Sequence, residues 1–212
     1  MRVWTIVVAG GSGTRFGGPK QFLSLGGRRV VDRAVEAARA ASDGVVLVVP
    51  AGAPVEPDPA GAAPVDAVVA GGSTRSASVR AGLAVVPADA DVVVVHDAAR
   101  PLAHVSLFER AVAAVAAGAD AAVCAVPVTD TIKRVSGTSV VETLDRSALV
   151  AVQTPQAFRA EALRRAHGGE PDATDDAGLV EAAGGRVVVV DGDRRNVKIT
   201  DPADLAVAEA LL

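Results

Sequence analysis

The sequence predicts an α/β fold: a Rossmann-like, mostly parallel β-sheet with helices on both faces. Continuous runs of Val, Ile and Ala alternate with longer helical patterns, which is typical of parallel strands covered on both faces. Of the 212 residues 50% are hydrophobic but only 2% are aromatic, so the core must be built from Val, Ala and Leu. The length suits one domain over residues 1–212, with a β-hairpin arm at about 127–150.

Six apolar runs are predicted to be strands, because they are apolar at consecutive positions and short enough for a buried strand. In chain order they are Val3–Ala9, Val45–Val49, Ala67–Val69, Asp91–His96, Ala121–Val126 and Arg186–Val190.

Five helical patterns lie among these runs: Arg29–Ala40, Ser73–Val86, His104–Ala117, Ala177–Ala183 and a last helix from Pro202 to the C-terminus. Ser73 is the expected N-cap of the second pattern, and Thr174-Asp175-Asp176 caps the fourth. In the last helix Asp201 is the expected N-cap, and Pro202 fits the first turn because its nitrogen has no hydrogen to donate.

Two segments depart from this alternation. Pro50–Pro64 is rich in proline and glycine and is expected to be a surface loop without an assigned function. Pro127–Thr154 has three β-branched stretches around the turn Ser136-Gly137, with no helix expected. A hairpin of this kind leaves the main core and must be buried elsewhere, so we expect a homodimer in which a partner subunit covers it.

Composition excludes several classes of protein. The net charge of −4 argues against a nucleic-acid binder that works through positive charge. A single cysteine excludes a disulfide scaffold and a cysteine-based zinc site. No apolar run approaches the roughly 18–20 residues that span a bilayer, and the apolar start leads into a glycine loop rather than a cleavage site. We therefore expect a cytoplasmic protein that binds neither nucleic acid nor membrane.

A glycine-rich loop with two cations, Arg15 and Lys20, follows the first strand at residues 9–20. Ligands bind beyond the carboxyl ends of parallel strands, where such loops let backbone N–H groups approach phosphates. The loop is not a dinucleotide fingerprint, because Phe16 stands where glycine or alanine is needed, and it is not a P-loop, because a proline separates the last glycine from Lys20. Only three of the 21 basic residues are Lys, which favours a specific role for Lys20.

Several blocks along the chain resemble one family of enzymes. They are Ala9–Arg15 with Pro19–Phe22, Gly71–Val79, His96–Pro101, Pro127–Lys133, Asp145-Arg146, Gln153–Gln156 and Asn196–Thr200. In this order they are similar to the 2-C-methyl-D-erythritol 4-phosphate cytidylyltransferases of the non-mevalonate isoprenoid pathway. The resemblance implies a nucleotidyltransferase fold and transfer of CMP from CTP to methylerythritol phosphate, releasing pyrophosphate.

The reaction implied is in-line attack of the substrate phosphate on the α-phosphorus of CTP. A phosphate is already a nucleophile at neutral pH, so the protein needs to position charges and neutralise them rather than supply a base.

The resemblance assigns four catalytic residues, Arg15, Lys20, Arg146 and Lys198. The CTP-binding residues that it implies are Ala9, Gly10, Gly11, Ser12, Gly13, Gly72, Ser73 and Ser78. Acceptor binding is assigned to Thr131, Arg146 and Lys198, of which the first two lie in the hairpin and would reach the active site of the neighbouring subunit.

Asp97 ends a predicted strand at the same edge of the sheet and is the expected ligand of Mg²⁺ or another divalent cation. A second metal carboxylate could be Asp191 or Asp193, and the sequence does not choose between them. Lys133 is either an exposed arm residue or a substrate contact.

The other candidate residues are expected to be structural. His96 should be a core histidine, His104 and His167 surface residues at helix ends, and Cys124 a small buried hydrophobe.

Three alternatives stay open. A cytidylyltransferase for another polyol phosphate, such as ribitol 5-phosphate, would share the CTP half of the site. Sugar 1-phosphate thymidylyl- or uridylyltransferases are disfavoured by the block Asp130–Arg134. An inactive nucleotide-binding paralogue would be expected to lack the catalytic cations.

Overall fold

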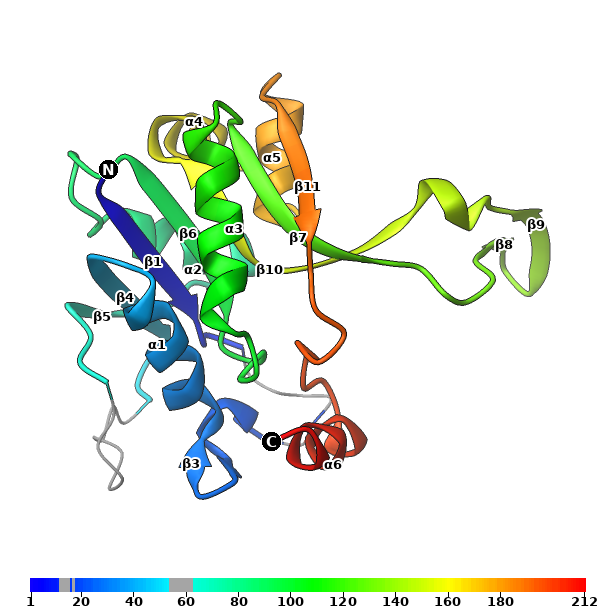
Figure 1. Cartoon of the computed structure of the whole chain (residues 1–212), viewed down its shortest axis with the longest axis horizontal. Coiled ribbons are helices and arrows are strands. Elements are labelled where there is room, and N and C mark those ends of the chain that lie inside the picture. Colours follow the sequence, from blue (N-terminus) through cyan, green and yellow to red (C-terminus); the bar gives the residue numbers. More distant parts are fainter. Residues whose placement is uncertain (12–15, 17, 54–62) are drawn as a thin grey trace.

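A seven-stranded sheet forms the centre of the molecule (Figure 1). The computed structural model describes residues 1–11, 16, 18–53 and 63–212. In spatial order the strands are β11 (Val187–Asp191), β7 (Ala121–Pro127), β10 (Val150–Arg159), β6 (Val92–Asp97), β1 (Val3–Val8), β4 (Gly44–Val49) and β5 (Ala67–Ala70). β10 runs antiparallel to both of its neighbours, and the other adjacent strands are parallel. The predicted mostly parallel α/β fold is confirmed.

Helices cover both faces of this sheet. α1 (Val30–Ala40) and α3 (Val105–Ala116) pack on one face, in front of the sheet in Figure 1. On the other face lie α2 (Arg75–Leu83), α4 (Ala160–Ala166) and α5 (Asp176–Ala182). In β1, Val7 packs into the first layer and its neighbour Ile6 into the second, and both are fully buried. Two-sided burial therefore explains why the strands are apolar at consecutive positions.

A smaller layer closes the lower part of the molecule in Figure 1. It contains the 3₁₀ turn η2 (Lys20–Phe22), the short strands β2 (Ser24–Leu25) and β3 (Arg28–Arg29), and α6 (Pro202–Ala210). Leu25, Val30, Ile199 and Ala208 form its buried cluster. The predicted start of α6 is confirmed, since Asp201 accepts hydrogen bonds from the first turn and Pro202 is the first helical residue.

Other helix boundaries differ from the sequence prediction. Thr74, rather than Ser73, is the N-cap of α2, because its hydroxyl accepts the hydrogen bond from the Ala77 N–H. The same helix ends at Leu83, before the predicted end. α4 was not predicted. Asp175 is confirmed as the cap of α5, where its side chain accepts from Gly178.

The largest difference is β10, which is not among the six predicted strands and starts in the segment Pro127–Thr154 that was assigned to the hairpin. The strand continues to Arg159 and lies between β6 and β7. The middle of β10 is polar and includes a proline, so its sequence lacks the continuous apolar pattern of a buried strand. Distant residues satisfy Gln153 and Thr154: the Gln153 amide exchanges hydrogen bonds with the backbone of Asp193, and the Thr154 hydroxyl accepts from the Asp97 N–H.

The hairpin arm projects from one side of the body (Figure 1). β8 (Lys133–Ser136) and β9 (Ser139–Thr143) pair antiparallel, and a 3₁₀ turn, η3 (Arg146–Ala148), stands in a segment where no helical structure was predicted. Every residue of the two strands is exposed, including Val135, Val140 and Val141 at 58%, 61% and 61%. The arm thus presents apolar side chains that its own chain does not cover.

The structural roles predicted for the histidines and for the cysteine are confirmed except in one case. His96 is fully buried, and burial lowers its pKa to about 4. Cys124 is also buried, which raises the pKa of its thiol to about 11, and His104 is exposed at the start of α3. The prediction for His167 was wrong: it is 5% exposed and its Nε2 lies 3.0 Å from Oδ1 of the buried Asp176. Among the described residues, no helix is long and apolar enough to cross a bilayer.

Candidate active site

A cavity of about 500 Å³ opens at the carboxyl ends of β1 and β6. Its walls come from the glycine-rich loop after β1, from η2, from the segment that starts α2, from the end of β6 and from the residues before α6. Parallel strands place their carboxyl ends at one edge of the sheet, so residues that are far apart in sequence meet there. The cavity is therefore where this fold is expected to hold a ligand.

Six of the residues predicted to bind CTP line the cavity: Ala9, Gly10, Gly11, Gly72, Ser73 and Ser78. Ser12, Gly13 and the catalytic candidate Arg15 lie outside the described residues.

Two of these glycines are closely packed. A Cβ on Gly72 would stand 2.4 Å from the Cβ of Ala77, and one on Gly10 would stand 3.1 Å from the Ser78 hydroxyl oxygen. Because Ser78 belongs to the first turn of α2, the first loop packs against this turn, and the Ser78 hydroxyl donates to the carbonyl of Thr74. The two main chains together form one wall of the cavity, where backbone groups can read the edge of a base.

Lys20 lines the cavity from the start of η2. The next residue, Gln21, is buried, and its amide nitrogen donates to the carbonyls of Ala9 at 2.9 Å and Gly11 at 3.2 Å. These two hydrogen bonds tie η2 to the glycine-rich loop and so position Lys20. Gln21 lies within the block Pro19–Phe22 that resembles the family, but no role was predicted for it.

Asp97, at the end of β6, lies between two cations. Lys198 Nζ is 2.6 Å from its Oδ2, and the Nε of Arg75 is 3.3 Å from its Oδ1. Burial by itself would raise the pKa of Asp97, but the charges of Arg75 and Lys198 hold it well below its usual range. The carboxylate is therefore ionised and faces the cavity, which is the donor chemistry that Mg²⁺ prefers.

Lys198 reaches this position from a segment without regular secondary structure. The segment is held by the Ile199 N–H, which donates to the carbonyl of Ala99. The buried side chain of Asn196 adds a second anchor, donating to the Gln153 oxygen and the Thr154 carbonyl. Lys198 is thus presented by a loop that is fastened to β10.

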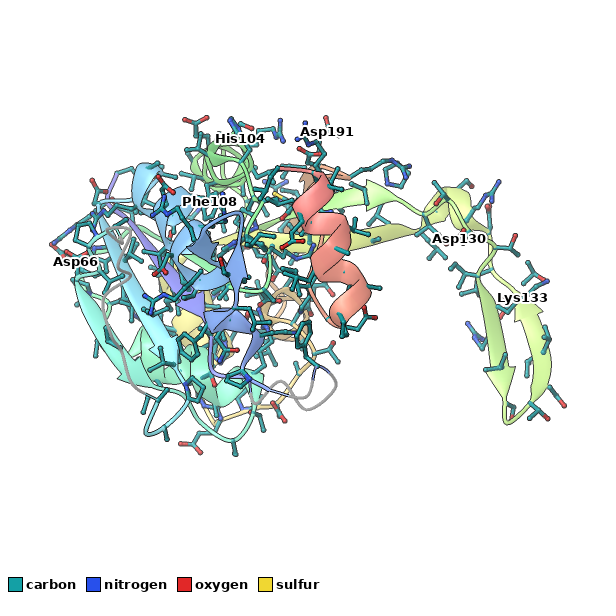
Figure 2. All side chains as sticks on the ribbon, turned by 90° about the horizontal axis from the view of Figure 1, so that it is seen from below. Asp66, His104, Phe108, Asp130, Lys133 and Asp191 are labelled. Atoms are coloured by element: carbon teal, nitrogen blue, oxygen red, sulfur yellow. The ribbon has the colours of Figure 1, made fainter. Side chains whose placement is uncertain are left out.

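The arm residues do not reach this cavity within one chain. Neither Thr131 nor Arg146 lines it, and the Arg146 guanidinium donates to the carbonyl of Thr129 on the arm itself. Figure 2 shows Asp130 and Lys133 on the projecting arm, away from the body. The Lys133 ammonium is bonded to the Thr143 hydroxyl across the hairpin.

The candidates for a second metal carboxylate do not join Asp97. Asp191 and Asp193 do not line the cavity. The backbone of Asp193 is bonded to Gln153, and its carboxylate accepts from the Arg195 N–H. In the part of the chain that the structure describes, no three His, Cys, Asp or Glu residues form a group that could hold a metal ion.

The chain is similar to known proteins over almost its whole length. The family described as 2-C-methyl-D-erythritol 4-phosphate cytidylyltransferase matches residues 3–212. The chain belongs to this family. A family member from Nocardia farcinica is 48% identical over 99% of this chain and 94% of its own length, and one from Rubrobacter xylanophilus is 43% identical over 98% and 93%.

Some relatives are longer. The bifunctional enzyme IspD/IspF of Anaeromyxobacter dehalogenans is 48% identical over the whole of this chain, which spans 57% of that protein. Among solved structures, the crystal structure of the family member from Thermus thermophilus matches with a TM-score of 0.82 at 36% identity, covering 100% of this chain and 98% of the other. The resemblance stated from the sequence blocks is confirmed, and the fold is that of the cytidylyltransferase family.

Proposed function

We propose that the protein transfers CMP from CTP to 2-C-methyl-D-erythritol 4-phosphate, forming the CDP-alcohol and pyrophosphate. The proposal depends on the composition of the cavity, and the family to which the chain belongs agrees with it. The cavity brings close-packed glycine loops, Lys20 and the Asp97–Lys198 pair to one edge of the sheet.

In the nucleotide half of the site, the main chain at Gly10 and Gly72 forms the wall against which the cytidine lies. Lys20 neutralises charge that develops at the α-phosphate and on the departing pyrophosphate, and Arg15 is proposed to do the same. Asp97 would hold Mg²⁺ or a similar cation, which would supply further neutralisation of the triphosphate charge. The ionised state of Asp97 and its position in the cavity wall support this role.

In the acceptor half, Lys198 binds the phosphate of the incoming substrate from within the chain. Thr131 and Arg146 bind it from the arm of a second copy, so the working unit is a homodimer. Two observations support the arrangement: the arm exposes valines that its own chain leaves uncovered, and neither arm residue lines the cavity of its own chain. The segment 127–150 is then a dimerisation arm on a single cytidylyltransferase domain, and we place the reaction in the cytoplasm.

A pyrophosphate-release assay tests this proposal. With CTP and Mg²⁺, methylerythritol phosphate should support turnover, ribitol 5-phosphate should be a poor acceptor, and EDTA should abolish the reaction. Preference for ribitol 5-phosphate would instead favour the alternative acceptor, and no turnover with either would favour an inactive paralogue.

A further inference from the structure

A chain of polar groups runs from Arg75, which lines the cavity beside Asp97, to the buried side chains of Asp176 and His167. The Nε of Arg75 donates to Asp97 Oδ1, and the Nη1 of the same guanidinium lies 2.6 Å from Asp176 Oδ2. Asp176 is fully buried, and its other oxygen lies 3.0 Å from His167 Nε2. Arg75 therefore bridges two carboxylates that are 79 positions apart in the chain (176 − 97).

Arg75 has little freedom to leave this position. It is the first residue of α2, and only 24% of its side chain is exposed. Breaking its contact with Asp176 would leave a buried carboxylate short of a partner, which is costly.

The segment before α5 is also fastened to α2 at two other points. Ser76 exchanges hydrogen bonds with the backbone of Ala173, and Arg80 donates to the carbonyl of Pro171 at 2.7 Å. Asp176 thus belongs to a firmly attached segment rather than to a loose loop, and it can brace the guanidinium.

The two oxygens of Asp97 have different surroundings. Oδ1 is held by Arg75, whereas Oδ2 is contacted by Lys198, whose side chain is 41% exposed. In the proposed reaction Lys198 is needed at the acceptor phosphate. Arg75 then remains as the cation that orients the carboxylate, with Oδ2 directed toward the cavity.

We propose that Arg75, braced by Asp176, is a positioning residue that orients Asp97 so that one carboxylate oxygen stays available to the divalent cation. The inference rests on the proposed function, because it assumes that Asp97 is a metal ligand. Partners of this kind orient metal-binding carboxylates, and their loss typically lowers metal affinity or activity by about 10- to 100-fold. Lysine cannot replace Arg75, since a point ammonium does not bridge two carboxylates as a planar guanidinium does.

Binding of CTP without acceptor tests the proposal by a measurement other than turnover. Isothermal titration calorimetry gives the Kd of CTP in EDTA and in Mg²⁺, and the ratio of the two is the gain that the metal provides. Asp97→Asn should lose this gain. In Arg75→Lys, which keeps the charge, the ratio of the two Kd values should be about tenfold or more below that of the wild type. The Kd of this variant in EDTA should stay near that of the wild type. Arg80→Lys is the matched control, because Arg80 joins the same helix to the same segment but does not contact Asp97.

The outcomes separate the two ideas. If Asp97→Asn keeps the full gain, the proposed metal site is wrong and the role of Arg75 is overturned with it. If Asp97→Asn loses the gain but Arg75→Lys keeps it, only the inference about Arg75 is overturned. Asp176→Asn provides a second variant if Arg75→Lys fails to fold by circular dichroism, and it should also reduce the gain. A full gain in Asp176→Asn would overturn the bracing role.

Discussion

Co-expression of two inactive variants tests whether the arm acts in the neighbouring subunit. Lys20 lines the cavity of its own chain, whereas Arg146 lies on the projecting arm and is bonded there to Thr129. If each site combines the cavity of one subunit with the arm of the other, Lys20→Ala disables every site of its homodimer through the nucleotide half. Arg146→Ala disables every site of its homodimer through the acceptor half.

A heterodimer of the two variants is different. One of its sites carries both changes, and the other combines an intact Lys20 with an intact Arg146. In a two-fold symmetric dimer with random pairing, about half of the dimers are mixed and each has one intact site, so activity should recover to about a quarter of the wild-type value.

The assay is pyrophosphate release by the co-purified variants, carrying two different affinity tags so that heterodimers can be isolated and counted. Isolated heterodimers should have about half of the wild-type activity per dimer, since one of two sites is intact. Heterodimers as inactive as either parent would refute action in trans. Arg146 would then serve its own subunit, and the arm would be a dimerisation device or a lid.

Three further predictions concern charge, base recognition and pH. Lys20→Ala should lower kcat by about 10²- to 10³-fold with a much smaller change in CTP affinity, the loss expected of a group that acts in the transition state. Lys20→Arg should also be poor, and near-normal turnover of either variant would mean that the loop has another role. CTP should be used at least roughly tenfold better than UTP, because a mismatched polar group left unpaired in the pocket costs about 1–3 kcal/mol. Equal use of the two nucleotides in a competition assay would contradict a cytidine pocket beside Gly72 and Ser78. His96 titrates at about pH 4 when folded, below its ordinary value of 6.5, so the unfolded chain binds the extra proton first as the pH falls. Above pH 6.5 the histidine is neutral in both states and the protein keeps its full stability. As the pH falls from 6.5 to 4, the free energy of unfolding should decrease by up to about 3 kcal/mol. Urea unfolding of wild type and His96→Gln across this range should show a shallower slope for the variant, and identical slopes would contradict the assignment.

Features set by neighbouring residues could be predicted from the sequence. The Val and Ile runs predict strands buried on both faces, because apolar side chains at consecutive positions point to opposite sides of a sheet, as Ile6 and Val7 do. Asp201 and Pro202 similarly predict the start of α6 within one turn. The glycine-rich loop predicts close approach of main chains, although the residue that it meets, Ser78, could not be named from spacing alone.

Features that depend on distant residues were decided by the tertiary structure. β10 is polar where a buried strand is expected to be apolar, and its Gln153 and Thr154 find their hydrogen-bond partners in the distant Asp97, Asp193 and Asn196. Asp97 and Lys198 are 101 residues apart, as are Arg75 and Asp176, and nothing near either member of a pair indicates the other. Chain periodicity records which side chains are buried, whereas the pairing of buried charges depends on which strand ends and loops the topology brings together.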